Sequence, residues 1–342
     1  MCGAENVYTY DTDQQSFLTP YFEELIGIYT PGNALTDNYP KDELRNLVDE
    51  LDERWGIFSD EACLSYQQKL EILKAICKDL NETMPTLFVD KVGLPELFDE
   101  DYLNASALVK RNDWAAFVSE IKTENRYHSK MVNLDVLENY CNILRKEYPE
   151  GSTFFRARIS DAEGYPAEKM SAPPPEKSSE GRANARGIAC LYVSRRPQTT
   201  FHEVRAGELD YITIGTFRAK KKFAVVDLPG IAEISPFAND MNLIDILDLA
   251  INKENLKKVD AEMSRALRRS DSTLEYIPTQ YIVDFIKSLT DEEGRIFDGV
   301  EYRSTLDKGG YNLAVFNPEL LECEAVEVYR VEALEYKSEK LK

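Results

Sequence analysis

The chain of 342 residues is long enough for two domains that each bury a sizeable core. Aromatic residues make up 11% of the chain and charged residues 30%, which indicates a globular protein. The chain contains no run of about 18 apolar residues, so no membrane span is predicted. The formal net charge of −20 disfavours nucleic acid as a direct partner, because nucleic-acid binding depends on neutralising phosphates.

The six cysteines are scattered along the chain and form no C-x-x-C pair. The sequence therefore predicts neither a disulfide framework nor a complete zinc site. This cysteine usage, together with an N-terminus that lacks a basic region followed by an apolar one, predicts a cytoplasmic protein. Because the chain has only two histidines, His128 and His202, a histidine-based metal centre is not expected either.

The first 150 residues are expected to form an all-α, acidic domain, since they contain 29 acidic and 14 basic residues, a net charge of −15. Apolar residues recur at helical spacing in five segments: 16–29, 39–58, 60–80, 108–127 and 134–148. Ser59 is expected to cap the third segment, because acidic residues follow it in the first turn. A ribonuclease site of the HEPN class would need an arginine five to seven positions before His128, and none occurs there.

The character of the sequence changes at residues 149–151, so the expected domains are 1–150 and 151–336. Residues 153–159 alternate like a half-buried strand, with Arg156 and Arg158 on one face. Two such arginines usually face solvent, but beside a basic loop they can also bind an anionic group. Residues 171–187 are rich in proline, serine and glycine, and their length predicts a lid.

The stretch 181–207 combines a basic, glycine-flanked loop, a short apolar strand that ends near Tyr192, and the start of a helix that carries Glu203. A cationic loop, an aromatic ring and one carboxylate suit a ligand that carries phosphates and a positive charge. Taken one at a time, these residues also fit a solvated loop beside a core strand. Residues 151–230 contain 13 basic and 9 acidic residues, a positive region small enough to suit a nucleotide.

The remaining pattern predicts a mixed sheet with helices. Strands are expected at 210–218, 223–227, 299–304, 312–316 and 325–334. Helices are expected at 239–251, 257–269 and 278–289. The fold class that follows is α+β, with an all-α domain ahead of a mixed domain.

Five motifs in the second half resemble the RES domain, a family named for an arginine, a glutamate and a serine. They are FFRAR at 154–158, GRANARGIACLY at 181–192, TTFHEVR at 199–205, YIPTQY at 276–281, and GVEYRST with GGYNLAVF at 299–316. The family is known mostly as the toxin half of bacterial toxin–antitoxin pairs whose antitoxin has a helix-turn-helix. Its fold is similar to that of ADP-ribosyltransferase toxins, and its members degrade NAD+.

The helical N-terminal segment resembles the domain of the HEPN/RES type that is fused ahead of some RES domains. Relatives of that domain often start with cysteine pairs that suggest a zinc knuckle. This chain has only Cys2 in the corresponding region, so no zinc is expected. The resemblance implies either a helix-turn-helix antitoxin or this N-terminal domain itself as the inhibiting partner.

The resemblance implies three catalytic residues, because the family arginine falls on Arg156, the glutamate on Glu203 and the serine on Ser304. Nicotinamide leaves NAD+ as a neutral molecule, so Glu203 is expected to stabilise the positive charge that develops on the ribose. Arg156 is expected to hold the pyrophosphate. Ser304 is expected to bind a ribose hydroxyl or the nicotinamide amide, or, on the plainer interpretation, to satisfy only its own turn.

Four further residues are expected to bind the substrate. Tyr192 would stack on the cationic nicotinamide ring, although the sequence alone fits a core tyrosine equally well. Arg182 and Asn184 occupy the position of the family's basic loop, and Arg158 lies next to Arg156 along the strand.

The resemblance thus implies an enzyme that cleaves the nicotinamide–ribose bond of NAD+, by phosphorolysis or hydrolysis, as a toxin or defence effector. NAD+ would be its substrate, and no metal is expected. An ADP-ribosyltransferase that modifies a macromolecule would use the same residues, and a non-enzymatic NAD-binding module is the second alternative. The acceptor, the trigger and whether the chain forms a homo-oligomer stay open.

Overall fold

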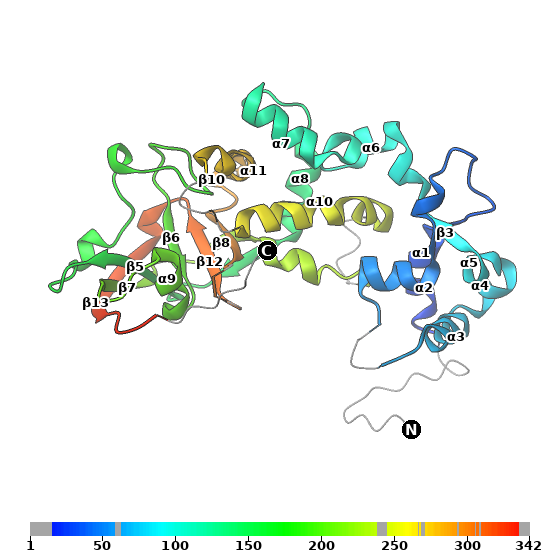
Figure 1. Ribbon diagram of the computed structural model, residues 1–342, viewed down its shortest axis with the longest axis horizontal. Coiled ribbons are helices and arrows are strands. Elements are labelled where there is room, and N and C mark those ends of the chain that lie inside the picture. Colours follow the sequence, from blue (N-terminus) through cyan, green and yellow to red (C-terminus); the bar gives the residue numbers. More distant parts are fainter. Residues whose placement is uncertain are drawn as a thin grey trace, which may run out of the picture. The chain divides into compact units, whose positions relative to one another are not determined.

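The computed structural model describes residues 16–58, 63–237, 245–265, 267, 271–292, 294–304, 306–307 and 309–334. The predicted cap Ser59 and the lone N-terminal Cys2 lie outside these residues. The chain separates into two compact units, one of residues 1–112 and 234–254 and one of residues 113–233 and 255–342 (Figure 1). Nowhere in the described part does a helix combine the length and apolar character needed to cross a membrane.

The first unit is mostly helical, with a small antiparallel sheet. Its helices are α1 (Thr19–Gly27), α2 (Leu47–Glu50), α3 (Tyr66–Ile76), α4 (Lys78–Thr83), α5 (Thr86–Val89) and α6 (Glu100–Ser106). The sheet has the order β1-β3-β2, formed by Thr30–Pro31, Lys91–Gly93 and Arg45–Asn46. Strands of two or three residues are too short to show alternation, so the sequence pattern did not predict them.

The single helix predicted at 39–58 is wrong. The segment instead forms a 3-10 turn (Lys41–Glu43), β2, α2 and a π-helical turn (Leu51–Trp55) that ends at Gly56, where φ is 66°. The pattern there comes from Leu47, Val48 and Leu51, which are indeed buried, but β2 pairs with β3 and so cannot be helical. Tertiary pairing therefore overrides the helical periodicity of this segment.

The second unit contains a mixed eight-stranded sheet, which confirms the α+β class. The strand order is β13-β7-β5-β6-β12-β11-β8-β4, and among the described pairings only β11 with β8 is parallel. The strands are β4 (Arg145–Tyr148), β5 (Thr153–Ser160), β6 (Leu191–Ser194), β7 (Tyr211–Ala219), β8 (Phe223–Asp227), β11 (Gly299–Arg303), β12 (Tyr311–Val315) and β13 (Leu321–Arg330). A separate hairpin joins β9 (Thr290–Asp291) to β10 (Gly294–Arg295).

The helices of this unit are α7 (Trp114–Thr123), α8 (Leu134–Ile143), α9 (Pro197–Val204) and α11 (Ile277–Ser288). Where two helices were predicted at 239–251 and 257–269, one helix, α10, runs over Ile246–Ser264 and crosses the division between the units along the chain. The gap predicted between them contains Asn252, which is fully buried. Its side chain bonds Leu108 N and Ser106 O, so a polar residue that interrupts the apolar pattern still belongs to the helix.

The division into units does not coincide with the boundary predicted at residue 150. Strand β4 comes before that boundary but pairs with β8 at the edge of the large sheet. Its Tyr148 is 4% exposed and its ring contacts Phe154 and Phe223. The charged sequence Arg145-Lys146-Glu147 carries no apolar alternation, so the pattern did not identify this strand.

The large sheet forks between strands β5 and β6. Strand β5 pairs with β7 along eight positions and β6 pairs with β12 along four, but β5 and β6 meet only at Phe155 and Ser194. Helix α9 covers the β5 side of the fork, where Phe201 and Val204 pack on Ala157 and its buried neighbours. Side chains on both sides of the fork therefore diverge and leave room for a ligand.

Candidate active site

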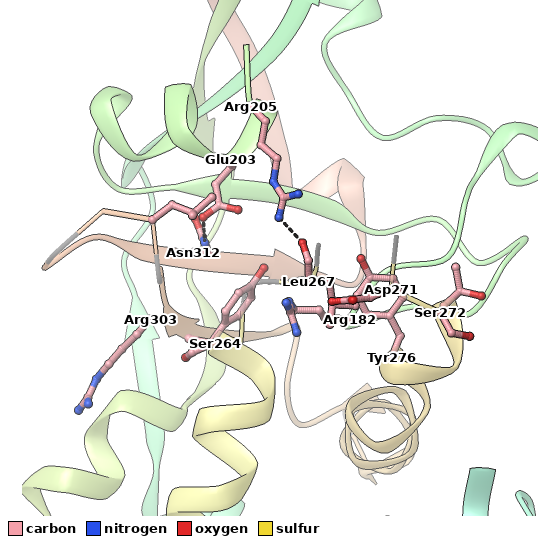
Figure 2. Close-up of a pocket in the computed structure, with 13 residues that line it drawn as sticks. Arg182, Glu203, Arg205, Ser264, Leu267, Asp271, Ser272, Tyr276, Arg303 and Asn312 are labelled. Carbon is pink, nitrogen blue, oxygen red and sulfur yellow. Dashed lines mark hydrogen bonds between the residues drawn. The ribbon is translucent and has the colours of Figure 1, made fainter. Parts of the chain in front are cut away.

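Two cavities lie beside the fork. One has a volume of about 380 Å³ and is lined by Arg205 and by hydroxyl groups such as that of Ser272 (Figure 2). The other, of about 310 Å³, is lined by Arg156 and Tyr192 at the fork itself. Five residues line both cavities: Arg182, Glu203, Tyr276, Tyr302 and Asn312. Because the cavities share a wall, they can receive the two halves of one elongated ligand.

Glu203 lies in the wall shared by the cavities, near the end of α9. Its Oε1 accepts hydrogen bonds from Ser304 Oγ and from Asn312 Nδ2, both at 2.8 Å, and the second bond is drawn in Figure 2. The Glu203 side chain is exposed, whereas Ser304 and Asn312 are buried. The carboxylate therefore faces the cavities while two neutral donors fix its orientation.

Ser304 contacts both its own turn and Glu203, and its predicted contact with a ribose hydroxyl or the nicotinamide amide stays a prediction. Its Oγ accepts hydrogen bonds from the backbone N–H groups of Leu306 and Asp307, both at 3.3 Å. A hydroxyl has one proton, and that proton is donated to Glu203. Ser304 thus satisfies its turn and orients the glutamate at the same time.

Arg156 lines the fork cavity together with Glu203. Its Nη1 donates to Met170 O at 3.2 Å, which holds the guanidinium in place and leaves its other N–H groups for a ligand. Burial, with a smaller effect from Arg158, lowers the pKa of Arg156 to about 10. The group is therefore still cationic at neutral pH, in a place where water screens its charge poorly.

Arg158 lies in neither cavity, so its predicted role in substrate binding does not fit its position. Its guanidinium donates to Lys169 O and stacks over the ring of Tyr165, 4.2 Å from the centroid. Tyr165 and Lys169 lie in the segment that follows β5, and this segment binds the side chain of Arg158. Alternation placed both arginines on one face but could not show which one reaches the site.

Tyr192 lines the fork cavity, and its hydroxyl is tied to the basic loop. The Tyr192 Oη donates to Asn184 Oδ1 at 2.6 Å and accepts from Ala183 N at 3.0 Å. Burial raises the pKa of Tyr192 well above its ordinary value, so the hydroxyl stays protonated and keeps donating. The ring is thereby held in a fixed position at the wall of the cavity.

Asn184 supports this arrangement rather than lining either cavity. It is 2% exposed. Its amide group donates to three backbone carbonyls, those of Ser179, Ala185 and Ile188. The predicted contact between Asn184 and the substrate is therefore not what the structure shows, because the side chain is committed to the shape of its own loop.

Arg182, in the same loop, reaches both cavities. Its Nη1 donates to Glu262 O at 2.8 Å, and its guanidinium lies 5.6 Å from the centroid of the Tyr276 ring. Tyr276, Tyr302 and Asn312 line both cavities but were not predicted as site residues. All three occur inside the family motifs, but none carries a charge or a spacing that marks it as functional.

The shared wall also includes Tyr302, which is 6% exposed. Burial, and then the nearby Glu203, raise the pKa of Tyr302, so this hydroxyl also remains a neutral donor. Within the described residues, no group of three or more His, Cys, Asp or Glu side chains is arranged to hold a metal ion.

The fold and the site together define an α+β domain in which the carboxylate of Glu203 lies in the wall shared by two joined cavities that arginines also line. A family model of the RES domain matches residues 153–337, and the chain belongs to the RES domain family. This family is linked in general to toxins that act on NAD and is known in toxin–antitoxin pairs. Comparison with curated proteins found no match, and comparison with solved structures found none either.

The family match begins at residue 153 and does not reach the helical N-terminal segment. The expected kinship of that segment with the domains fused ahead of other RES domains stays a prediction.

Proposed function

We propose that the chain consumes NAD+ by cleaving the bond between nicotinamide and ribose, through hydrolysis or phosphorolysis, and acts as a toxin or defence effector. The observation that carries this proposal is the exposed carboxylate of Glu203, held by two neutral donors in the wall shared by the two cavities. When nicotinamide leaves as a neutral molecule, the ribose develops the charge of an oxocarbenium ion. A preoriented carboxylate next to that carbon stabilises the transition state.

The two donors matter because they orient Glu203 without neutralising it. Ser304 and Asn312 are uncharged, so the carboxylate keeps its negative charge for the reacting ribose. Among the described residues both bonds end on Oε1, and Oε2 is therefore the oxygen that can face the substrate. A cationic partner in place of either donor would lower the electrostatic stabilisation that the reaction needs.

The other side chains fit the remaining parts of NAD+. Arg156 in the fork cavity and Arg182 between the cavities supply positive charge for the pyrophosphate. The ring of Tyr192, fixed through its hydroxyl, offers a face on which the cationic nicotinamide ring can stack. These contacts would place the scissile bond beside Glu203.

The first cavity supports phosphate as an acceptor alongside water. Arg205 and Arg182 both line it, and their charge favours an anion over a neutral nucleophile. Transfer of ADP-ribose to a macromolecule would use the same carboxylate and differs only in the acceptor.

The test is incubation of the purified full chain with NAD+, with and without phosphate, followed by mass analysis of the products. Hydrolysis releases nicotinamide and ADP-ribose, phosphorolysis releases nicotinamide and phosphorylated ADP-ribose, and transfer adds the mass of ADP-ribose to a macromolecule. Glu203→Gln should lower turnover by about a hundredfold or more, because it removes the charge but keeps the shape.

Glu208→Gln is the matched control, since Glu208 is exposed and lines neither cavity. It should leave turnover close to that of the parent. Turnover by Glu203→Gln at the rate of the parent would remove the proposed role of the glutamate. Binding of NAD+ without loss of NAD+ would instead indicate a non-enzymatic module.

A further inference from the structure

Helix α11 holds the backbone of the basic loop through two side chains. Gln280 Nε2 donates to the carbonyls of Gly181 at 2.8 Å and Asn184 at 3.0 Å. Lys287 Nζ donates to Ala183 O at 2.7 Å. Residues 280 and 287 are seven apart and so lie on one face of the helix. The side chains on this face bind three backbone carbonyls of the loop.

These interactions rest on a rigid base. Helix α11 is anchored in the core, with Ile282, Val283 and Ile286 all at most 1% exposed. The side chain of Lys287 is itself only 13% exposed, and its Nζ lies 5.1 Å from the centroid of the Phe316 ring. The donors therefore have few other positions to adopt, and the loop backbone is held where they point.

The loop is also closed on itself. Gly181 N donates to Asn184 O at 2.9 Å, and a side chain added at Gly181 would come within 2.6 Å of Tyr192 Oη. The carbonyls on both sides of Arg182 are thus fixed by α11, while its side chain extends into both cavities. Neither Gln280 nor Lys287 lines either of those cavities.

We propose that Gln280 and Lys287 are positioning residues, which act on the substrate only through Arg182. This inference rests on the proposed function, because it assumes that Arg182 binds the phosphates of NAD+. If the hydrogen bonds from α11 were removed, the loop could move, and the Arg182 guanidinium would spend less time in the position that binds the phosphates. The effect would appear in ligand affinity, since Arg182 contacts the ground state and the transition state alike.

The experiment measures NAD+ binding calorimetrically in the full-length Glu203→Gln chain, in which turnover does not interfere. Gln280→Met and Lys287→Met, which keep the length of each side chain but remove the donors, should each weaken NAD+ binding about tenfold. Lys287→Arg, which keeps a cationic donor, should restore most of the affinity. Ser288→Ala on the same helix is the control, because the Ser288 hydroxyl donates to Phe285 O within α11.

A double-mutant cycle with Arg182→Ala separates positioning from general loosening of the fold. If Gln280 acts through Arg182, then Gln280→Met should weaken binding no further once Arg182→Ala is present. Additive losses, or unchanged affinity in Gln280→Met, would overturn the inference. The proposed function fails separately, through absence of NAD+ turnover in the parent chain.

Discussion

The most informative perturbation of the fold is Lys146→Met, at the edge of the large sheet. Lys146 Nζ lies 2.8 Å from Glu301 Oε2 and 3.1 Å from Asp227 Oδ2. The Glu301 side chain is only 1% exposed, and its second described partner is Tyr148 Oη at 2.6 Å. Without Lys146, the buried carboxylate would keep one neutral donor and no counter-charge.

The expected loss of stability follows from the burial of the two partners. Removing one partner of a buried ion pair costs about 3–5 kcal/mol. The Lys146 side chain is 35% exposed, so solvent screens part of the interaction, and about 2–3 kcal/mol is expected. The melting temperature of this unit should fall by roughly 5–10 °C. Glu301→Gln in the Lys146→Met background should recover most of the loss, because no buried charge is then left unpaired.

The pH dependence separates charge from packing. Burial alone would lower the pKa of Lys146, but Glu301, Tyr148 and Asp227 together raise it above its ordinary value. The stability that comes from the raised pKa is complete below the unfolded-state value of about 10.4, so it stays constant between pH 6 and 9 in the parent. It is lost as pH rises above that value, so the loss of stability in Lys146→Met relative to the parent should shrink above about pH 10.4.

Thermal unfolding followed by circular dichroism measures these differences. Lys222→Met is the matched control, because its ion pair with Glu147 is exposed on both sides and should contribute little to stability. Two results would refute the assignment of a buried charge pair at Glu301. One is a loss of stability in Lys146→Met that is no larger than that in the control, and the other is a loss that does not change with pH.

Three further outcomes are expected. In calorimetric titrations, Arg156→Ala should weaken the binding of NAD+ more than the binding of nicotinamide mononucleotide, because only NAD+ has a pyrophosphate bridge. Equal losses of affinity for the two ligands would show that Arg156 contacts another part of NAD+. Ser304→Ala should lower kcat about tenfold with little change in KM for NAD+, since its hydroxyl orients Glu203, and a change confined to KM would contradict this role. A fragment of residues 151–342 should unfold at a lower denaturant concentration than a fragment of residues 113–342, because the shorter fragment lacks β4 and leaves Glu301 unpaired. Equal unfolding midpoints for the two fragments would show that β4 is dispensable.

Patterns along the chain were sufficient to predict the family, the α+β class and most strands of the second unit. Strands β5, β7 and β8 follow from alternating or continuous apolar residues, which depend only on neighbours along the chain. The motifs also led to the prediction of Arg156 and Glu203 as site residues, because their residue types and order are local features. Local patterns were sufficient wherever the determining interactions are themselves local.

The contacts of the site residues with one another depend on the tertiary structure. Ser304 and Glu203 are 101 positions apart, and no local pattern predicts the hydrogen bond between them. Arg158 and Asn184, both expected at the substrate, are instead held by backbone carbonyls near them in the fold. The partners that decide such roles come from distant strands and loops, and no periodicity within a segment records them.

The same reason explains the errors in the fold. Asn252 interrupts an apolar pattern and suggested a break in the helix, but in the folded chain its amide bonds a backbone more than 140 positions away, which keeps α10 continuous. Strand β4 is charged along its length, yet it belongs to the sheet because Glu301 on β11 binds Lys146 and Tyr148. A polar residue is predicted from sequence as exposed, and only the folded structure supplies the partner that permits its burial.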